Sequence, residues 1–345
     1  MYSIWDLYLP VSVEMDPCST QDSCLLPNIS QEEYTCLLRT GKLCSIGSFG
    51  IVHQCVWRGR KVAIKSFNPL VCDSDPRIIN QVLLHAKCHM HPNVADVFAA
   101  GPNFPNECTF YVVELAENHS LDTVLHQFLD VKYSLAHAIN WMLHATKAAD
   151  HLHRVCSPPV CHGDLKPANM LLFDHGRLLK LGDFGSAGPL GITSDRRPDT
   201  CVYTAPEIAY LRTGDQLEYT DKCDVYSLSI TFWELLARRR PYEQTSGQSF
   251  GKTSFWNIFR QRPSKLLNCP PLLQELYERG WSEDPQSRPS AYQIVQLLDF
   301  LLHTVLLRTG ELDPLTIPSD FQPEVVPDDL EANPLWSLEK DRGVH

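Results

Sequence analysis

Two short segments in the middle of the chain combine carboxylate, ammonium and amide side chains at close spacing. The first has the sequence CHGDLKPAN and contains Asp164, Lys166 and Asn169, and Asp183 follows nineteen residues after Asp164. An aspartate can orient a hydroxyl nucleophile and accept its proton, and a nearby lysine can meet the negative charge of a transferring phosphoryl group. Amide and carboxylate oxygens are ligands that suit Mg²⁺. We therefore expect Asp164 and Lys166 to be catalytic, and Asn169 and Asp183 to hold Mg²⁺.

A glycine-rich segment nearer the N-terminus is suited to binding phosphate. It runs from Ser45 to Val52 with the sequence SIGSFGIV, and such a hairpin lets backbone N–H groups approach phosphate oxygens. Taken alone, a hairpin with two glycines is more often a plain turn. The sequence VAIK that ends at Lys65 strengthens the interpretation, because it places one ammonium group where it can neutralise nucleotide phosphates.

The elements that must position these groups change character near Glu117. Before it, short β-rich segments are expected at 43–46, 51–57, 61–67, 95–99 and 109–113. One helix interrupts them, with a cap at Asp75 and an end at His91-Pro92. After it, amphipathic helices are expected at 136–153, 223–237, 256–260, 271–281 and 292–307. The pattern predicts an α+β protein in which a small β-rich lobe precedes a larger α-helical lobe.

Length and composition indicate an ordinary folded protein with acidic ends. The 345 residues are 43% hydrophobic and 21% charged, which is typical of globular proteins. The net charge of −11 is concentrated at the ends: residues 1–33 carry six acidic residues and no Lys or Arg, and residues 311–345 carry nine acidic against two basic residues. We expect both ends to be solvated, flexible tails, the second extended by its prolines.

Several classes of function lose support from the sequence. No basic stripe with interleaved aromatic residues is present, so nucleic-acid binding is not expected. No uninterrupted apolar run approaches about 20 residues, so no membrane span is expected, and the N-terminus does not resemble a secretory signal.

The cysteines and histidines predict no metal site. Thirteen cysteines without a Cys-x-x-Cys pair indicate reduced thiols, which fit a cytosolic or nuclear compartment. Cys161 is expected to be buried and inert. The histidines at 85, 89 and 91 are expected to be ordinary polar helix residues rather than metal ligands.

In this order and spacing the segments resemble the eukaryotic protein kinases, over about Tyr34 to Leu306. Further positions that carry the resemblance are Ala205-Pro206-Glu207, Asp224 and Arg288. Three stretches narrow it to the transforming-growth-factor-β-activated type of MAP kinase kinase kinase: WELLARRRPY from Trp233, DKCDV from Asp221 and WSEDPQSRPS from Trp281.

The resemblance implies a bilobal protein-kinase fold that binds Mg-ATP between its lobes. The N-lobe would span 34–113, the hinge 114–117 and the C-lobe 118–306, between an acidic tail over 1–33 and another over 307–345. Lys166 gives the catalytic loop its serine/threonine-kinase form, so the expected acceptors are Ser and Thr hydroxyls of a MAP kinase kinase. The residues expected to bind ATP are Ser45, Gly47, Gly50, Val52, Ala63, Lys65, Glu114 and Ala116.

The sequence differs from the kinase family pattern at three positions near the expected catalytic and ATP-binding residues. Ser45 stands where the first loop glycine is usual, which is a mild change. No glutamate occurs between Lys65 and Glu107, so the helix that should pair with Lys65 offers none. The expected position falls on Val82, with Gln81 next to it. We expect phosphoryl transfer to be weakened rather than abolished, and the substitution Val82→Glu to raise turnover.

Gly163 replaces the arginine that in the family contacts a phosphate on the activation loop. Glycine has no side chain for that contact, so regulation through it is not expected. Thr193, Ser194 and Thr200 are candidate phosphorylation sites, although plain loop hydroxyls explain the first two better.

The resemblance also implies two structural roles: Glu207 should pair with Arg288, and Asp224 should tie the catalytic loop to its supporting helix. The leading interpretation is a cytoplasmic serine/threonine kinase in stress or immune signalling. The alternative is a pseudokinase that keeps the fold as a binding or scaffolding protein. The related kinase engages adaptor proteins through a coiled-coil extension that has no counterpart in this sequence, so adaptor binding is unsupported.

Overall fold

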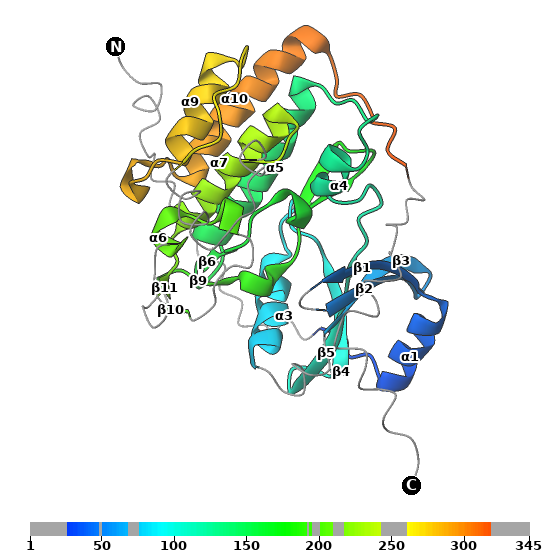
Figure 1. The fold of residues 1–345 in the computed structure, drawn as a ribbon. Coiled ribbons are helices and arrows are strands. Elements are labelled where there is room, and N and C mark those ends of the chain that lie inside the picture. Colours follow the sequence, from blue (N-terminus) through cyan, green and yellow to red (C-terminus); the bar gives the residue numbers. More distant parts are fainter. Residues whose placement is uncertain are drawn as a thin grey trace. The chain divides into compact units, whose positions relative to one another are not determined.

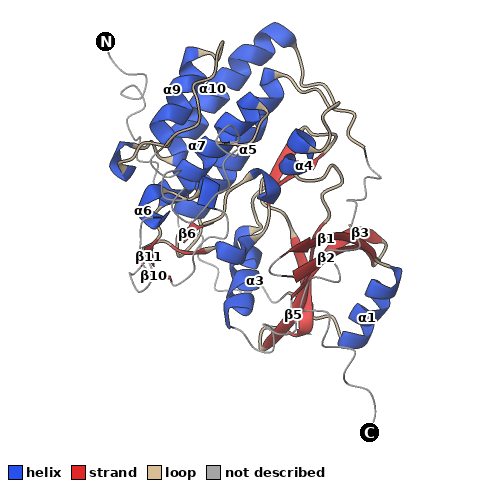
Figure 2. Cartoon of the chain, viewed as in Figure 1, coloured by secondary structure: helices blue, strands red, loops and turns tan. Residues whose placement is uncertain are grey.

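The chain folds into two compact units, which are described separately. The computed structural model describes residues 26–47, 50–67, 76–191, 193–194, 201–209, 217–242 and 261–318. Within these, the sheet unit comprises residues 26–82 and 97–115, and the helical unit comprises residues 83–96 and 116–317. Figure 2 shows strands dominating the first and helices the second. The expected α+β class, with a β-rich N-lobe and a helical C-lobe, is confirmed.

The sheet unit is built on a five-stranded antiparallel sheet of strand order β1-β2-β3-β5-β4. Its strands lie close to the expected positions: β1 (Lys42–Gly47), β2 (Gly50–Trp57), β3 (Arg60–Phe67), β4 (Val97–Asn103) and β5 (Glu107–Glu114). β4 begins two residues later than expected, because the N–H of Ala95 donates to the carbonyl of Leu181, the last residue of the short strand β8 (Leu178–Leu181), rather than to β5.

One face of this sheet is covered by α1 (Gln31–Thr40), a helix that the sequence analysis did not predict. Tyr34 stacks on Phe110 of β5 with ring centroids 4.0 Å apart, and the indole N–H of Trp57 donates to Glu33 over 2.9 Å. Ile29, just before the helix, is fully buried in the same apolar cluster. Residues 26–33, which we expected to belong to a flexible tail, are therefore part of the sheet unit.

The predicted helix before His91-Pro92 is present as α3 (Pro76–Cys88). Its expected cap, Asp75, lies outside the described residues. The first part of α3 groups with the sheet unit and the part from Leu83 onward with the helical unit.

Six helices form most of the described helical unit. They are α4 (Leu121–His126), α5 (Leu135–Arg154), α6 (Pro206–Ala209), α7 (Asp221–Ala237), α9 (Pro271–Gly280) and α10 (Ala291–Thr309). Four of these match expected helices within two residues at each end. The helix expected at 256–260 lies outside the described residues. α10 packs along α5, and α7 packs against both α5 and α9 (Figure 1). The buried aromatic residues Trp141 and Trp233 lie in this core.

Short elements between the helices carry most of the predicted catalytic residues. The antiparallel pairs are β6 (Val160–Cys161) with β9 (Gly188–Pro189), β7 (Met170–Phe173) with β8 (Leu178–Leu181), and β10 (Thr193–Ser194) with β11 (Leu217–Glu218). The single 3₁₀ turns are η2 (Pro167–Asn169), η3 (Phe184–Ser186), η4 (Cys201–Tyr203) and η6 (Pro285–Ser287). None of these short strands was predicted, because two to four residues show no periodicity.

The chain after α10 returns to the surface of the helical unit. The N–H of Leu315 donates to the carbonyl of His175 over 2.8 Å, and its side chain is buried in the helical core. The carbonyl of Asp313 is 2.8 Å from Nε2 of His137 on α5. The tail expected from residue 307 therefore does not begin there: 307–309 complete α10, and 310–317 belong to the helical unit.

One stretch of the described chain, Pro285–Thr309, is long and apolar enough to cross a membrane by length and composition alone. A helix in the core of a folded domain passes the same test. Ile294, Leu297 and Leu298 of this stretch are buried in the helical core, so the stretch has a packing role in the fold.

Candidate active site

Three of the four predicted catalytic and metal residues meet in the loop after β6. The ammonium group of Lys166 lies 2.7 Å from Oδ2 of Asp164. The side-chain amide of Asn169 donates to the same carboxylate oxygen over 2.9 Å and to the backbone carbonyl of Asp164 over 2.7 Å. η2 holds Asn169 in this position, since Pro167 suits the first residue of a helical turn. The loop thus presents one carboxylate braced by a cation and an amide.

The loop is fixed from beneath by Asp224, which is fully buried at the start of α7. Its carboxylate accepts hydrogen bonds from the backbone N–H groups of His162 and Gly163 over 2.8 and 2.9 Å, and lies 2.8 Å from Nε2 of His153 on α5. Burial opposes the charge, but the hydrogen bonds prevail and lower the pKa of Asp224. The expected structural role of Asp224 is confirmed.

Asp183 is held next to this loop by backbone hydrogen bonds. The N–H of Gly182 donates to the carbonyl of Asn169 over 2.9 Å, and Nε2 of His162 lies 3.0 Å from the carbonyl of Gly182. Asp183 itself has a left-handed backbone (φ 53°) and accepts the N–H of Gly185 over 3.2 Å. The two predicted metal residues, Asn169 and Asp183, therefore lie on directly bonded segments.

Phe184 anchors this second segment in the helical unit. It is fully buried between the rings of His85 on α3 and His162, with centroid distances of 4.3 and 5.1 Å. Nε2 of His85 lies 2.8 Å from the carbonyl of Ala95, and burial lowers the pKa of His85 to about 3, so this ring is neutral at pH 7. His85 is thus neither a metal ligand nor an ordinary surface residue, and its packing role had no signal in the sequence.

Gly163 occupies a backbone position that disfavours a side chain. Its φ is +75°, and a Cβ at this residue would lie 2.8 Å from the carbonyl oxygen of Ser186. An L-residue would be strained here. The backbone at this position therefore suits the glycine that replaces the family's arginine. Its N–H is held by the carboxylate of Asp224.

The predicted phosphate-binding residues share one face of the sheet. Ser45, Val52, Lys65 and Tyr111 are directly opposed partners on successive strands, so their side chains lie in one row on the same face. Ala63, two residues before Lys65, lies on that face as well. It is the face opposite to the one that α1 covers. The structure thus brings together Ser45, Val52, Ala63 and Lys65.

The glycine-rich hairpin closes this row at its end. Gly47 pairs with Gly50 at the ends of β1 and β2. A Cβ at Gly50 would lie 2.0 Å from the carbonyl oxygen of Ser66, and its φ is +151°, so the position requires glycine. The tip residues, Ser48 and Phe49, lie outside the described residues.

The side chain of α3 that reaches toward this row belongs to Gln81. Its amide donates to the phenol oxygen of Tyr111 over 3.3 Å, and both side chains are buried. Tyr111 is the direct neighbour of Lys65 across the strands. Val82, the position favoured by the sequence for the missing glutamate, is fully buried. Gln81 therefore contacts a cross-strand neighbour of Lys65, and the alignment of Val82 with the family glutamate stays a prediction.

The two predicted hinge residues follow directly from the sheet. Glu114 ends β5 opposite Val62 of β3. Ala116 begins the next part of the helical unit, and its carbonyl accepts the N–H of His119 over 3.4 Å. Both are partly exposed. Their predicted contact with adenine stays a prediction.

Glu207 and Arg288 form the ion pair that the resemblance implied. Nη1 and Nη2 of Arg288 lie 2.7 and 2.8 Å from the two carboxylate oxygens of Glu207. The guanidinium is fully buried and also donates to the carbonyls of Lys222 and Ser282. The pair joins α6 to the segment before α10.

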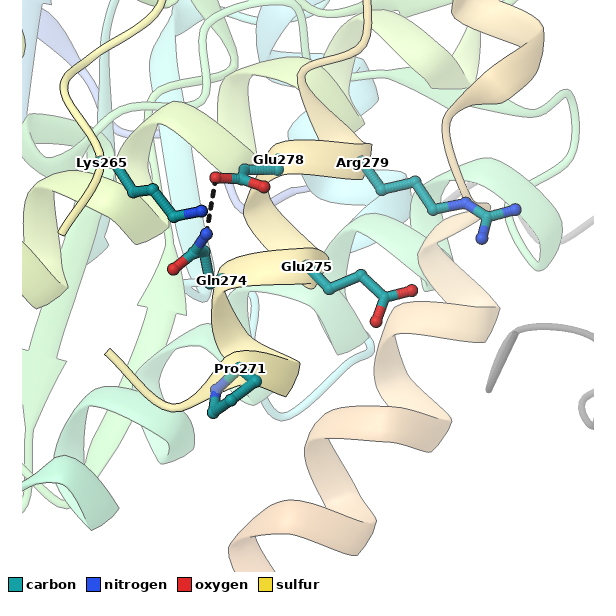
Figure 3. A pocket seen from close by; sticks show the side chains of 6 residues that line it. All are labelled: Lys265, Pro271, Gln274, Glu275, Glu278 and Arg279. Carbon is teal, nitrogen blue, oxygen red and sulfur yellow. Dashed lines mark hydrogen bonds between the residues drawn. The ribbon is translucent and has the colours of Figure 1, made fainter. Parts of the chain in front are cut away.

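One further side-chain cluster and one surface depression lie outside the predicted site. Asp122, His126 and Glu234 offer ligand atoms within 4.8 Å of one another, but Arg240 contacts Asp122 over 2.9 Å, and His126 and Tyr203 each lie 2.7 Å from Glu234. These contacts already satisfy the carboxylates. Figure 3 shows a surface depression on α9 that none of the predicted site residues lines; its walls are Lys265, Pro271, Gln274, Glu275, Glu278 and Arg279.

The described groups fit the chemistry that the sequence predicts. The side-chain amide of Asn169 donates both of its N–H hydrogens to Asp164. The side-chain carbonyl oxygen of Asn169 is therefore the atom suited to bind a hard cation. The Asp183 carboxylate offers a second oxygen of the kind that Mg²⁺ prefers, and a metal site at these two residues stays a prediction. The candidate phosphorylation sites Thr193 and Ser194 lie on β10, and Thr200 lies outside the described residues.

Comparisons with known proteins agree with this geometry. The protein kinase domain family matches residues 39–298. The chain is 32% identical over 253 residues to mitogen-activated protein kinase kinase kinase 7 of Drosophila melanogaster, covering 73% of this chain and 35% of that protein. It is 31% identical over 280 residues to the human protein of that name, covering 81% and 43%. The bovine protein is also 31% identical, with 81% and 45% covered. The chain thus spans less than half the length of these relatives.

Proposed function

Because the chain belongs to the protein kinase domain family, we propose that it transfers the γ-phosphoryl group of ATP to Ser and Thr hydroxyls of a protein substrate. The observation that supports this most is the contact of Asp164 with both Lys166 and Asn169, at 2.7 and 2.9 Å. A carboxylate, an ammonium group and an amide in mutual contact are the parts that phosphoryl transfer needs.

Each residue of the loop has a distinct task in this proposal. Asp164 accepts the proton of the attacking hydroxyl at its carboxylate and orients that hydroxyl toward the phosphorus. Lys166, already beside Asp164, balances negative charge as the phosphoryl group transfers. Asn169 and Asp183 would hold Mg²⁺, which supplies positive charge to the phosphate oxygens.

The sheet unit provides the nucleotide side of the site. Lys65 would neutralise phosphate charge, and the glycine-rich hairpin would bind phosphate oxygens through backbone N–H groups. Ser45, Val52 and Ala63 on the same face would contact the rest of the nucleotide. Glu114 and Ala116 would hydrogen-bond adenine through their backbone.

The substrate class is proposed from the relatives. Their name states that they are mitogen-activated protein kinase kinase kinases, so we infer that this chain acts on a MAP kinase kinase in cytoplasmic signalling, of the stress or immune type. Lys166 after Asp164 supports Ser and Thr as acceptors. Since the chain spans less than half of those relatives, their other properties are not transferred to it.

A pseudokinase is the second candidate, and two observations favour it. The α3 side chain that contacts Tyr111, the cross-strand partner of Lys65, is the neutral Gln81 rather than an acid, and Gly163 cannot contact an activating phosphate. The enzyme is preferred, because Lys65, Asp164, Asn169 and Asp183 are all retained, and a chain that only binds partners has no chemical need for all four.

The experiment is transfer of labelled phosphate from ATP to a purified MAP kinase kinase. The variant Asp183→Asn removes one metal-binding carboxylate, and Asp299→Asn, at an exposed position of α10, is the matched control. We expect label with the wild type and the control, and a loss of about 10²-fold or more with Asp183→Asn. Equal label from the wild type and Asp183→Asn would leave the scaffold function.

A further inference from the structure

Two cysteines that lie 68 positions apart in the sequence are in contact within the helical unit. Cys88 is the last residue of α3, and Cys156 follows the end of α5. Their sulfur atoms are 3.2 Å apart, and both are free thiols. Neither has a role in the proposed transfer reaction.

The surroundings of the two thiols differ. Cys88 is fully buried, whereas Cys156 is partly exposed. His151 lies in the last turn of α5, and its backbone carbonyl accepts the N–H of Cys156 over 3.0 Å. The ring of His151 stacks on the ring of His91, with the centroids 4.8 Å apart. The stacked rings of His91 and His151 and the sulfur contact of Cys88 with Cys156 therefore both join the region at the end of α3 to the end of α5.

These surroundings separate the acidities of the pair. The hydrogen bond with Cys88 lowers the pKa of Cys156, and a second one with His151 adds to this against the effect of partial burial. The same sulfur contact and deeper burial raise the pKa of Cys88. Cys156 is thus the more exposed thiol and the one whose pKa is lowered, so it is suited to be the attacking cysteine, with Cys88 as the resolving cysteine.

We propose that Cys88 and Cys156 form a site of oxidation by hydroperoxides, at which a disulfide ties the end of α3 to the end of α5. The proposal does not depend on phosphoryl transfer, because the site shares no residue with the candidate active site. Its chemical partner is a peroxide small enough to reach the partly exposed sulfur of Cys156.

The oxidation proceeds in two balanced steps. The Cys156 thiolate attacks one peroxide oxygen, so that an S–O bond forms, the O–O bond breaks, and the leaving oxygen departs as water or an alcohol after taking up a proton. Cys88 then attacks the sulfur of the Cys156 sulfenic acid, an S–S bond forms, and the sulfenic oxygen leaves as water with the thiol proton. The two thiols lose two electrons and the peroxide gains them.

Other described cysteines lack one or more of these features. Burial raises the pKa of the Cys161 and Cys223 thiols. Cys269 has the same class of exposure as Cys156, but burial raises its pKa as well. Cys269 is therefore a matched control for the reactivity of Cys156.

The test uses the full reduced chain treated with hydrogen peroxide, followed by thiol blocking and peptide mass spectrometry. We expect one peptide that joins Cys88 to Cys156, lighter by two hydrogen atoms and separated again by dithiothreitol. Before oxidation, Cys156 should react with iodoacetamide roughly tenfold faster than Cys269 at neutral pH. If Cys156 reacts no faster than Cys269 and no joined peptide forms, the proposal is overturned.

Single substitutions assign the two roles. In Cys88→Ser, Cys156 should persist as a sulfenic acid that a cyclic 1,3-dione captures, whereas in Cys156→Ser, Cys88 should stay reduced. Capture of Cys88 in Cys156→Ser at the wild-type rate would overturn the assignment of Cys156 as the attacking thiol. If either variant does not fold, the melting temperature of the wild type tests the proposal instead. It should rise on oxidation, because a disulfide restricts the unfolded chain, and it should return to its first value on reduction.

Discussion

The side-chain amide of Gln81 donates a hydrogen bond to the phenol oxygen of Tyr111 over 3.3 Å, in a buried part of the sheet unit. Tyr111 is the cross-strand partner of Lys65. This neutral bond connects α3 to the sheet at the place where an ion pair with Lys65 is expected from the family pattern. Tyr111, which the sequence analysis did not single out, therefore connects α3 to the row of side chains that contains Lys65.

The substitution Gln81→Glu should raise turnover, because it places a carboxylate on an α3 position that contacts Tyr111 in the Lys65 row. Val82→Glu should instead lower the free energy of unfolding, since it buries a charge at a position with no exposed surface. The measurement is turnover of both variants together with urea unfolding. A gain in turnover from Val82→Glu and none from Gln81→Glu would contradict the placement of Gln81.

Tyr111→Phe should weaken the binding of Mg-ATP by roughly tenfold, because it removes the bond that anchors α3 beside Lys65. Tyr34→Phe is the matched control: its phenol donates to Ser66 over 2.8 Å on the other face of the same sheet. Both variants lose one hydroxyl, so both should lose about 1 kcal/mol of stability. Calorimetric titration separates them, and equal affinities for the two would count against a role of Tyr111 in positioning Lys65.

Glu207→Gln should lower the free energy of unfolding by about 2–4 kcal/mol, because it leaves the buried guanidinium of Arg288 without its anionic partner. Asp299→Asn breaks the exposed pair with Lys147, whose atoms are 3.4 Å apart, and should change stability by less than about 0.5 kcal/mol. Urea unfolding of both variants tests the contrast. Similar small losses from the two would show that Arg288 is satisfied by carbonyl groups alone.

The stability of the helical unit should fall in mild acid because of His144. Burial lowers the pKa of His144 from 6.5 to about 4, with Lys147 and His91 adding to this, and its Nδ1 accepts the N–H of Leu179 over 3.3 Å. Because the folded pKa is depressed, the unfolded state takes up the proton first. Stability from this group is therefore complete above pH 6.5 and is lost as the pH falls toward 4, by about 1.4 kcal/mol at pH 5.5.

His144→Gln tests this expectation, since glutamine can accept the same hydrogen bond without titrating. Its unfolding free energy should fall less steeply than that of the wild type between pH 6.5 and 4. His303→Gln, at an exposed position of α10, is the matched control. Parallel curves for the wild type and His144→Gln would remove His144 as a cause of acid sensitivity.

The sequence predicts those parts of the fold that have a long or chemically distinctive pattern. The five strands and the helices α5, α7, α9 and α10 lie within a few residues of their expected places, because each has a sustained apolar period. The loop from Asp164 to Asn169 could be interpreted from residue types alone. Its contact with Asp224 was also foreseen through the family resemblance.

Elements stabilised by distant contacts could not be predicted in this way. α1 has no fully buried residue, and its place follows from Tyr34 and Glu33 contacting strands that come later in the chain. The choice between Gln81 and Val82 depends on the rotation of α3 about its axis, which a one-residue shift in alignment changes by about 100°. His85 beneath Phe184 is likewise a tertiary contact with no local pattern.

The segment 310–317 gives the helical unit a boundary that differs from the end of its last helix. The side chain of Leu315 packs in the helical core beside the β7–β8 turn, close to Gly176. A recombinant fragment that stopped at Leu306 would expose this apolar surface to water and favour association between copies. Fragments intended for crystallisation or calorimetry should therefore extend to Pro318.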